Sequence, residues 1–86
     1  MDRDLLIRAG EALRQGEDWR RPLARLLGPL HPDGPPDELD PRMVSRWASG
    51  AMGIPDWVQE ALARLTRETG ERLLEVADKL EAEPGP

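Results

Sequence analysis

The sequence predicts an all-α domain of four to five helices. Apolar residues recur at spacings of three and four in several segments, which is the period of a helix with one buried face. Proline, glycine and polar capping residues separate these segments, and no run alternates as a strand would. Eighty-six residues are enough for one domain but leave little room for an internal cavity. We therefore expect a single domain over residues 1–82 and a disordered tail at 83–86.

The first helix is expected at about residues 4–15. Asp2 or Asp4 can accept the free N–H groups at its start, and Gly16 can end it. One face of this helix is apolar and is formed by Leu5, Leu6, Ala9, Ala12 and Leu13.

The second helix is expected at 19–27. Asp18 can cap it, Pro22 must lie in its first turn, and Gly28 stands where a left-handed C-terminal cap is needed. Its apolar face is formed by Trp19, Leu23, Leu26 and Leu27. A loop over 29–39 follows, because four prolines and a glycine within residues 29–38 exclude regular structure.

The third helix, at 41–49, has the clearest boundaries in the chain. Asp40 is a good N-cap, Pro41 suits the first helical position, and Gly50 follows the last helical residue. Its apolar side carries Met43, Val44, Trp47 and Ala48. Its other side carries the polar residues Arg42, Ser45, Arg46 and Ser49.

Two further helices are expected at 55–69 and 71–82. Pro55 opens the first of them, and Gly70 either breaks the helical pattern or only weakens it by about 1 kcal/mol. The apolar stripe of the last segment has two interpretations. It can pack on the first helix as core, which we favour for so small a chain, or it can form a seam with a second copy. The stripe consists of Leu73, Val76, Ala77 and Leu80.

The composition excludes several classes of function. Cysteine is absent and His31 is the only histidine, so we expect no metal site and no cofactor. No nucleophile–base pair or glycine-rich phosphate loop is present, so we expect neither an enzyme nor a small-molecule substrate. No apolar run approaches the ~20 residues of a membrane span, and we expect a cytoplasmic location without membrane association.

The charge distribution bears on nucleic-acid binding. The formal net charge of −5 opposes binding by bulk attraction. Residues 1–50 hold eight arginines and nine acidic residues, a net charge of −1. Residues 51–86 hold four basic and eight acidic residues, a net charge of −4. A basic surface on the N-terminal part of the chain is therefore compatible with the overall acidity.

The third helix suits reading of the DNA major groove. Arg42 and Arg46 lie one turn apart on its outer side, and arginine can donate two hydrogen bonds to guanine. Ser45 and Ser49 are short donors on the same side. The second helix carries Arg20, Arg21 and Arg25, which can contact phosphates.

Two stretches, Leu23-Ala24-Arg25-Leu26-Leu27-Gly28 and Asp40 to Gly50, resemble the helix-turn-helix of Cro/lambda-repressor-like (Xre-type) proteins. The resemblance covers roughly residues 19–58, and Ile54-Pro55 is similar to the segment that follows the recognition helix in that family. It implies a compact helical fold, binding to double-stranded operator DNA, and often a homodimer. It also implies that Arg42, Ser45 and Arg46 read bases and that Arg20 contacts a phosphate.

One departure from the family is large. Its turn has three or four residues, whereas eleven separate Gly28 from Asp40 here. This insertion can bulge away, re-aim the third helix or contact DNA itself. The sequence thus favours a transcriptional regulator, a bacterial or phage repressor. The alternative is a protein-interaction module, such as an antitoxin-like or inhibitor protein, that does not bind DNA.

Overall fold

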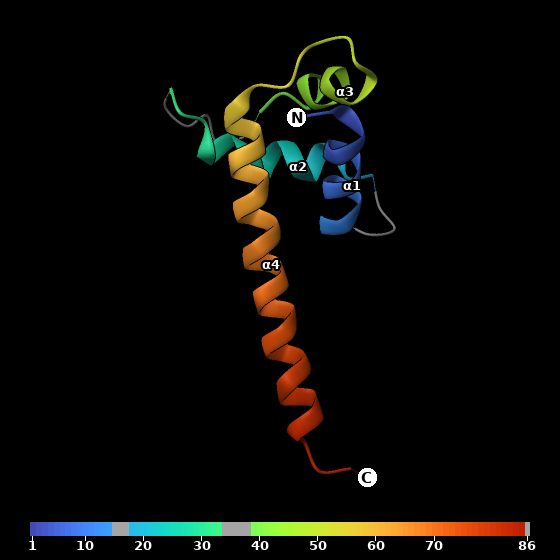
Figure 1. The fold of residues 1–86 in the computed structure, drawn as a ribbon, viewed down its shortest axis with the longest axis vertical. Coiled ribbons are helices and arrows are strands. Elements are labelled where there is room, and N and C mark those ends of the chain that lie inside the picture. The colour runs from blue at the N-terminus through green and yellow to red at the C-terminus, as the bar shows by residue number, and fades with distance from the viewer. Residues whose placement is uncertain (15–17, 34–38, 86) are drawn as a thin grey trace.

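The computed structural model describes residues 1–14, 18–33 and 39–85, and it is all-helical there, as the sequence predicts (Figure 1). Four α-helices and one 3-10 helix make up the described chain. They are α1 (Arg3–Leu13), α2 (Arg20–Leu27), η1 (Gly28–Leu30), α3 (Pro41–Ser49) and α4 (Asp56–Ala82).

Helices α1, α2 and α3 pack with the first part of α4 into a head, and the rest of α4 projects from it (Figure 1). The molecule measures 52 × 25 × 19 Å for this reason. The core of the head is apolar and contains Leu6, Trp19, Leu23, Ala24, Leu27, Leu39, Val44, Trp47, Ala48, Val58, Ala61 and Leu62. No polar or charged side chain is buried among the described residues.

The capping residues of the first and third helices behave largely as predicted. Asp2 accepts a hydrogen bond from the Leu5 amide at 2.8 Å, and Asp40 accepts one from the Arg42 amide at 3.0 Å. Gly50 ends α3 in the left-handed conformation, with φ of +85°. The predicted stop at Gly16 lies outside the described residues, and α1 itself ends at Leu13.

The ends of α2 differ from the prediction. Its N-cap position is Trp19, while the Asp18 carboxylate accepts from the Arg20 amide at 3.2 Å. Gly28 is right-handed, with φ of −50°, so the left-handed cap expected there is wrong. The chain instead tightens into η1, where the Gly28 amide donates to the Ala24 carbonyl and the His31 amide donates to the Gly28 carbonyl at 3.2 Å. Regular structure therefore enters the segment 29–39, where none was expected.

The two helices expected at 55–69 and 71–82 are one helix, α4. Gly70 lies within it, and no heavy atom comes within 4 Å of where its Cβ would be. One glycine costs about 1 kcal/mol, which flanking helix formers offset. Ion pairs between side chains one turn apart stabilise the helix on both sides of Gly70: Arg64–Glu68 at 3.0 Å and Glu75–Lys79 at 3.2 Å.

The last part of α4 does not pack on α1, which corrects the interpretation favoured from the sequence. Leu73, Val76 and Leu80 are 66, 54 and 69% exposed, because α4 has left the head before it reaches them. The segment beyond Ala82 is not helical up to Gly85, and Pro86 lies outside the described residues.

Candidate nucleic-acid interface

Helix α3 is held in the head by its inner side. Val44 and Trp47 are fully buried, and Trp47 meets the ring of Trp57 edge-on, with 6.5 Å between ring centroids. The indole N–H of Trp47 has no acceptor within the described part of the chain, so packing rather than hydrogen bonding fixes this side chain. Arg3 of α1 donates to the Ser49 carbonyl at 3.0 Å and so places a cation at the C-terminal end of α3.

The outer side of α3 is open to solvent. Arg42, Ser45, Arg46 and Ser49 are all exposed, which is where a groove-reading helix must present its side chains. Arg46 forms no ion pair with any residue in the described ranges. Its guanidinium therefore keeps its hydrogen-bonding capacity.

Arg42 is engaged by its own helix cap. The Arg42 Nε donates to Asp40 Oδ2 at 3.1 Å, and the Arg42 Nη2 donates to the same oxygen at 2.9 Å. The side-chain hydrogen bonds from Arg42 lower the pKa of Asp40, with the nearby charge of Arg46 adding to the effect, and they raise the pKa of Arg42. The Arg42 side chain is 82% exposed, and exposed ion pairs are weak. A competing phosphate or base can therefore exchange with Asp40.

The two serines of the outer side differ in their bonding. The Ser49 hydroxyl donates to the Arg46 carbonyl at 3.1 Å and accepts from the Ala51 amide at 3.3 Å, so it helps to end the helix. Ser45 lies in the middle of α3 and is exposed. Of the four expected base-reading residues, Ser45 and Arg46 therefore have the most open hydrogen-bonding capacity.

The three arginines of α2 lie on the exposed side of that helix. The Arg20 guanidinium sits 5.0 Å from the ring centre of Trp19, and it pairs with Asp18 at 3.6 Å. Since the Arg20 side chain is still 47% exposed, this arrangement orients the guanidinium without covering it. Arg21 and Arg25 complete this set of cations on the helix that packs most closely with α3.

The insertion leaves and rejoins the helix pair at one place. The Leu39 amide donates to the Ala24 carbonyl at 3.0 Å, and the Gly28 amide donates to the same carbonyl. Leu39 is buried in the head. The two ends of the insertion thus meet at the C-terminal end of α2. Helices α2 and α3 pack as a pair despite the eleven residues between Gly28 and Asp40.

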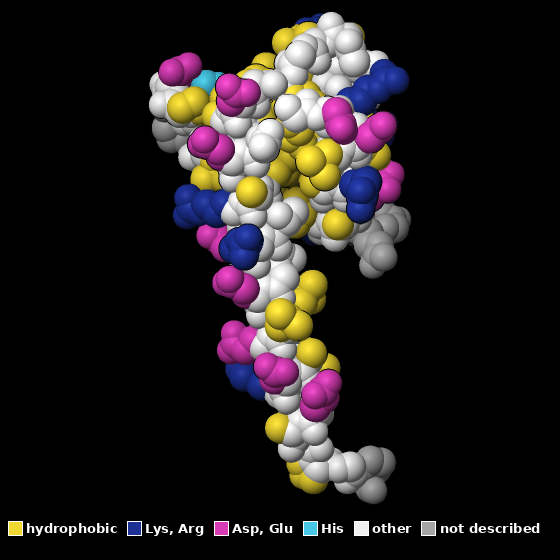
Figure 2. All heavy atoms as spheres, in the orientation of Figure 1, with side chains coloured by type: hydrophobic (Ala, Val, Ile, Leu, Met, Phe, Trp, Pro, Cys, Tyr) yellow, Lys and Arg dark blue, Asp and Glu magenta, His cyan; other side chains and the backbone are white. Residues whose placement is uncertain are grey.

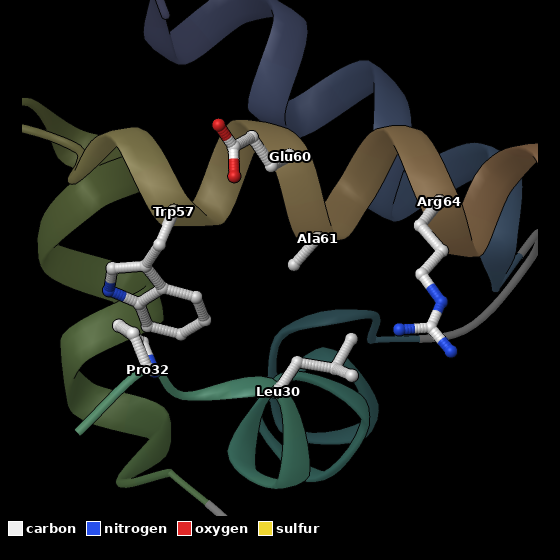
Figure 3. Close-up of a pocket in the computed structure, with 6 residues that line it drawn as sticks. All are labelled: Leu30, Pro32, Trp57, Glu60, Ala61 and Arg64. Atoms are coloured by element: carbon white, nitrogen blue, oxygen red, sulfur yellow. The ribbon is translucent and has the colours of Figure 1, made fainter. Parts of the chain in front are cut away.

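The first part of the insertion packs against α4. The His31 ring lies 4.9 Å from the Trp57 ring, centroid to centroid. Leu30 and Pro32 face Trp57, Ala61 and Arg64 across a shallow pocket of about 270 Å³ (Figure 3). The first part of the insertion therefore packs on α4.

Acidic side chains lie on both parts of the molecule. Figure 2 shows them along the projecting part of α4 and also on the head, and α3 lies at the opposite end of the molecule from the end of α4 (Figure 1). The projecting part carries Glu68, Glu71, Glu75, Asp78 and Glu81 together with Arg67, Arg72 and Lys79, which is a net charge of −2 out of the formal −5. The head keeps acidic residues of its own, and Asp40 lies at the start of α3 itself.

Two positioning residues had no clear signal in the sequence. Gly10 is buried in α1 under the ring of Trp19, and Arg3 caps a helix 46 residues away. A glycine inside an otherwise regular helical pattern is the one available sign of such a close approach. Nothing local marks Arg3, because its acceptor is a backbone carbonyl.

Comparison with models of protein families, with curated proteins and with solved structures gives no match, so the residues themselves carry the functional argument. In residues 1–14, 18–33 and 39–85, no three acidic or histidine side chains gather as metal ligands would. Within the same ranges, no helix has the length and apolar character needed to cross a bilayer.

Proposed function

We propose that this chain is a helix-turn-helix DNA-binding protein that lays α3 in the major groove, and that it regulates transcription as a bacterial or phage repressor. The observation that carries the proposal is the two-sided character of α3. Val44 and Trp47 fix its inner side in the core, while Arg46 stands unpaired on its outer side among the described residues. A fixed helix with an available arginine is what direct readout of guanine requires.

The pairing of α2 with α3 supports the same function. Phosphate contacts set the position of a recognition helix, and they come from the neighbouring helix and from backbone N–H groups at helix starts. Arg21 and Arg25 are exposed on α2, and the hydrogen bond from Leu39 to Ala24 keeps the pair together across the insertion. Few cations are involved, so we expect a modest number of phosphate contacts.

Binding to selected duplexes tests the proposal. Duplexes with a randomised core are enriched on the immobilised protein, and the selected sequence is then titrated by fluorescence anisotropy at several salt concentrations. We expect affinity to fall with salt as phosphate contacts release counterions. Arg46→Ala should weaken binding by about 1–3 kcal/mol and relax the sequence preference. Arg67→Ala, which removes the same charge from the projecting helix, is the matched control and should change binding little.

Asp40→Asn is a second arm of this experiment. Asparagine still caps a helix, so α3 keeps its start, but Arg42 loses its ion-pair partner and one negative charge leaves the interface. We expect tighter binding and a steeper salt dependence than in the unsubstituted protein. Unchanged binding in both Arg46→Ala and Asp40→Asn would show that α3 is not the reading element.

A protein-interaction module without DNA binding is the second candidate. The observation that favours it is the exposed apolar side of α4, formed by Leu73, Val76 and Leu80. A stable complex with another protein, together with no enrichment of any duplex, would establish this alternative in place of the first.

A further inference from the structure

The projecting part of α4 exposes apolar side chains that no described residue covers. Leu73, Val76 and Leu80 lie more than half exposed, three and four residues apart. At about 100° per residue, all three fall within roughly 40° of Leu62 around the helix axis. Leu62 is 3% exposed, because the head covers this side of α4 there. The side of α4 that is buried at Leu62 thus continues, past two threonines, to uncovered apolar side chains, and Figure 2 shows hydrophobic side chains on the lower part of the helix.

This uncovered face, which we call the α4 seam, has the pattern of a helix-pairing surface. Its positions are Thr69, Leu73, Val76 and Leu80, with steps of four, three and four residues. Two small residues, Gly70 and Ala77, flank one side of the seam and allow a second helix to approach closely. A helical segment of about 16 residues with no tertiary contacts is marginal in water, since helices gain most of their stability from packing of an apolar face.

We propose that a second copy of this chain covers the α4 seam, and that the two helices run antiparallel. The head decides the direction. Leu5 and Ala9 of α1 line a groove together with Leu62 and Thr66 of α4, so α1 occupies the seam side of α4 as far as Thr66. A parallel helix would have to carry its own head into that space. An antiparallel helix brings only its slender C-terminal end there.

The head also sets the register. The longest overlap it allows places Leu73 opposite Val76 of the second copy and Leu80 opposite Thr69 of the second copy. Ala82 then reaches the level of Arg67 of the second copy, just short of α1. This arrangement is two-fold symmetric, so each apolar contact occurs twice.

The charges beside the seam are compatible with this pair. Lys79 forms an exposed ion pair with Glu75 on its own helix, at 3.2 Å, which reduces its repulsion of another cation. Arg72 of one copy therefore meets an ion pair of the other rather than a bare cation. Antiparallel helices also place opposite dipole ends together.

The size of the seam indicates a weak, reversible dimer. Its exposed side chains offer on the order of 300 Å² of apolar surface per copy. A pair then buries on the order of 600 Å², which is less than the roughly 1,000 Å² that a stable specific interface needs, so the pair is weak and transient. We expect the dimer to form at high protein concentration and to dissociate on dilution.

Sedimentation equilibrium of two neighbouring leucine variants tests the seam. Leu73 and Leu74 are 66 and 67% exposed, but Leu74 lies about 120° away from Leu62 around the axis. Leu73→Lys should abolish the dimer, whereas Leu74→Lys should leave it. Both positions are on the surface of a projecting helix, so neither variant threatens the core. A protein that stays monomeric up to millimolar concentration, or a dimer that survives Leu73→Lys, overturns the proposal.

Cysteine cross-linking tests the direction, and the chain has no cysteine of its own. Thr69→Cys combined with Leu80→Cys should give a covalent dimer under mild oxidation. The two sites on one helix are about 16 Å apart, too far for an internal disulfide. Leu80→Cys alone should give no cross-linked dimer, because its opposite residue is Thr69. Efficient cross-linking of Leu80→Cys alone would show a parallel pair and overturn the proposal. Neither test uses DNA, so the dimer and the proposed function can fail separately.

Discussion

The contact between Gly10 and Trp19 gives the sharpest test of how the head is packed. A Cβ at position 10 would lie 2.5 Å from Cδ2 and 2.8 Å from Cζ3 of the Trp19 indole, and closer still to Cε3. The indole is rigid and only 5% exposed, so it cannot swing into solvent to make room. Gly10→Ala must therefore move the ring, or move α1 away from α2.

The cost follows from two opposing effects. Extra volume in a packed core costs about 1–3 kcal/mol, and contacts with a rigid ring belong near the top of that range. Alanine in place of glycine inside a helix stabilises the helix by about 1 kcal/mol. We expect a net loss of about 2 kcal/mol, out of a total stability on the order of 5 kcal/mol. For a chain of this size, that corresponds to a fall of about 8–16 °C in Tm.

Urea unfolding followed by tryptophan fluorescence measures this loss, and thermal unfolding followed by circular dichroism confirms it. Gly70→Ala is the control, because it makes the same chemical change in a helix where nothing lies within 4 Å. It should raise helix content and cause no loss of stability. If Gly10→Ala is as stable as the unsubstituted protein while Gly70→Ala behaves as expected, the close packing of α1 on Trp19 is wrong.

Two further perturbations address α3. Gly50→Ala should cost about 1–2 kcal/mol in urea unfolding, because φ of +85° strains any residue with a Cβ. Gly50→Asn should cost less, and equal losses would argue against the left-handed cap. The folded-state pKa of Asp40 lies below its ordinary value of 3.8, so its pairing with Arg42 stabilises the fold above that value and is lost as the pH falls through the lowered pKa. The difference in Tm between the unsubstituted protein and Asp40→Asn should therefore be constant near neutral pH and shrink below about pH 4. A difference that does not change with acid would exclude this ion pair as a contributor.

The candidate interface was only partly predictable. The sequence indicates the outer side of α3 because Asp40, Pro41 and Gly50 fix the ends of the helix and its period fixes the two sides. It does not indicate that Arg42 turns back to Asp40, because the choice between solvent and a neighbouring carboxylate depends on side-chain geometry. The sequence also does not indicate that the two ends of the insertion lie together, because this depends on a hydrogen bond between Leu39 and Ala24, which are 15 residues apart.

By itself the sequence determined the helical class, the limits of α3 and the apolar faces, because these follow from capping chemistry and a period of 3.6 residues. Only the tertiary structure decided what those faces meet. Leu62 and Leu73 lie on one face of one helix, yet the head buries the first and leaves the second uncovered. The tertiary structure likewise shows that α4 runs through Gly70 without a break. No neighbouring atom lies within 4 Å of where its Cβ would be, so glycine costs the helix only the lower intrinsic helix preference of one residue.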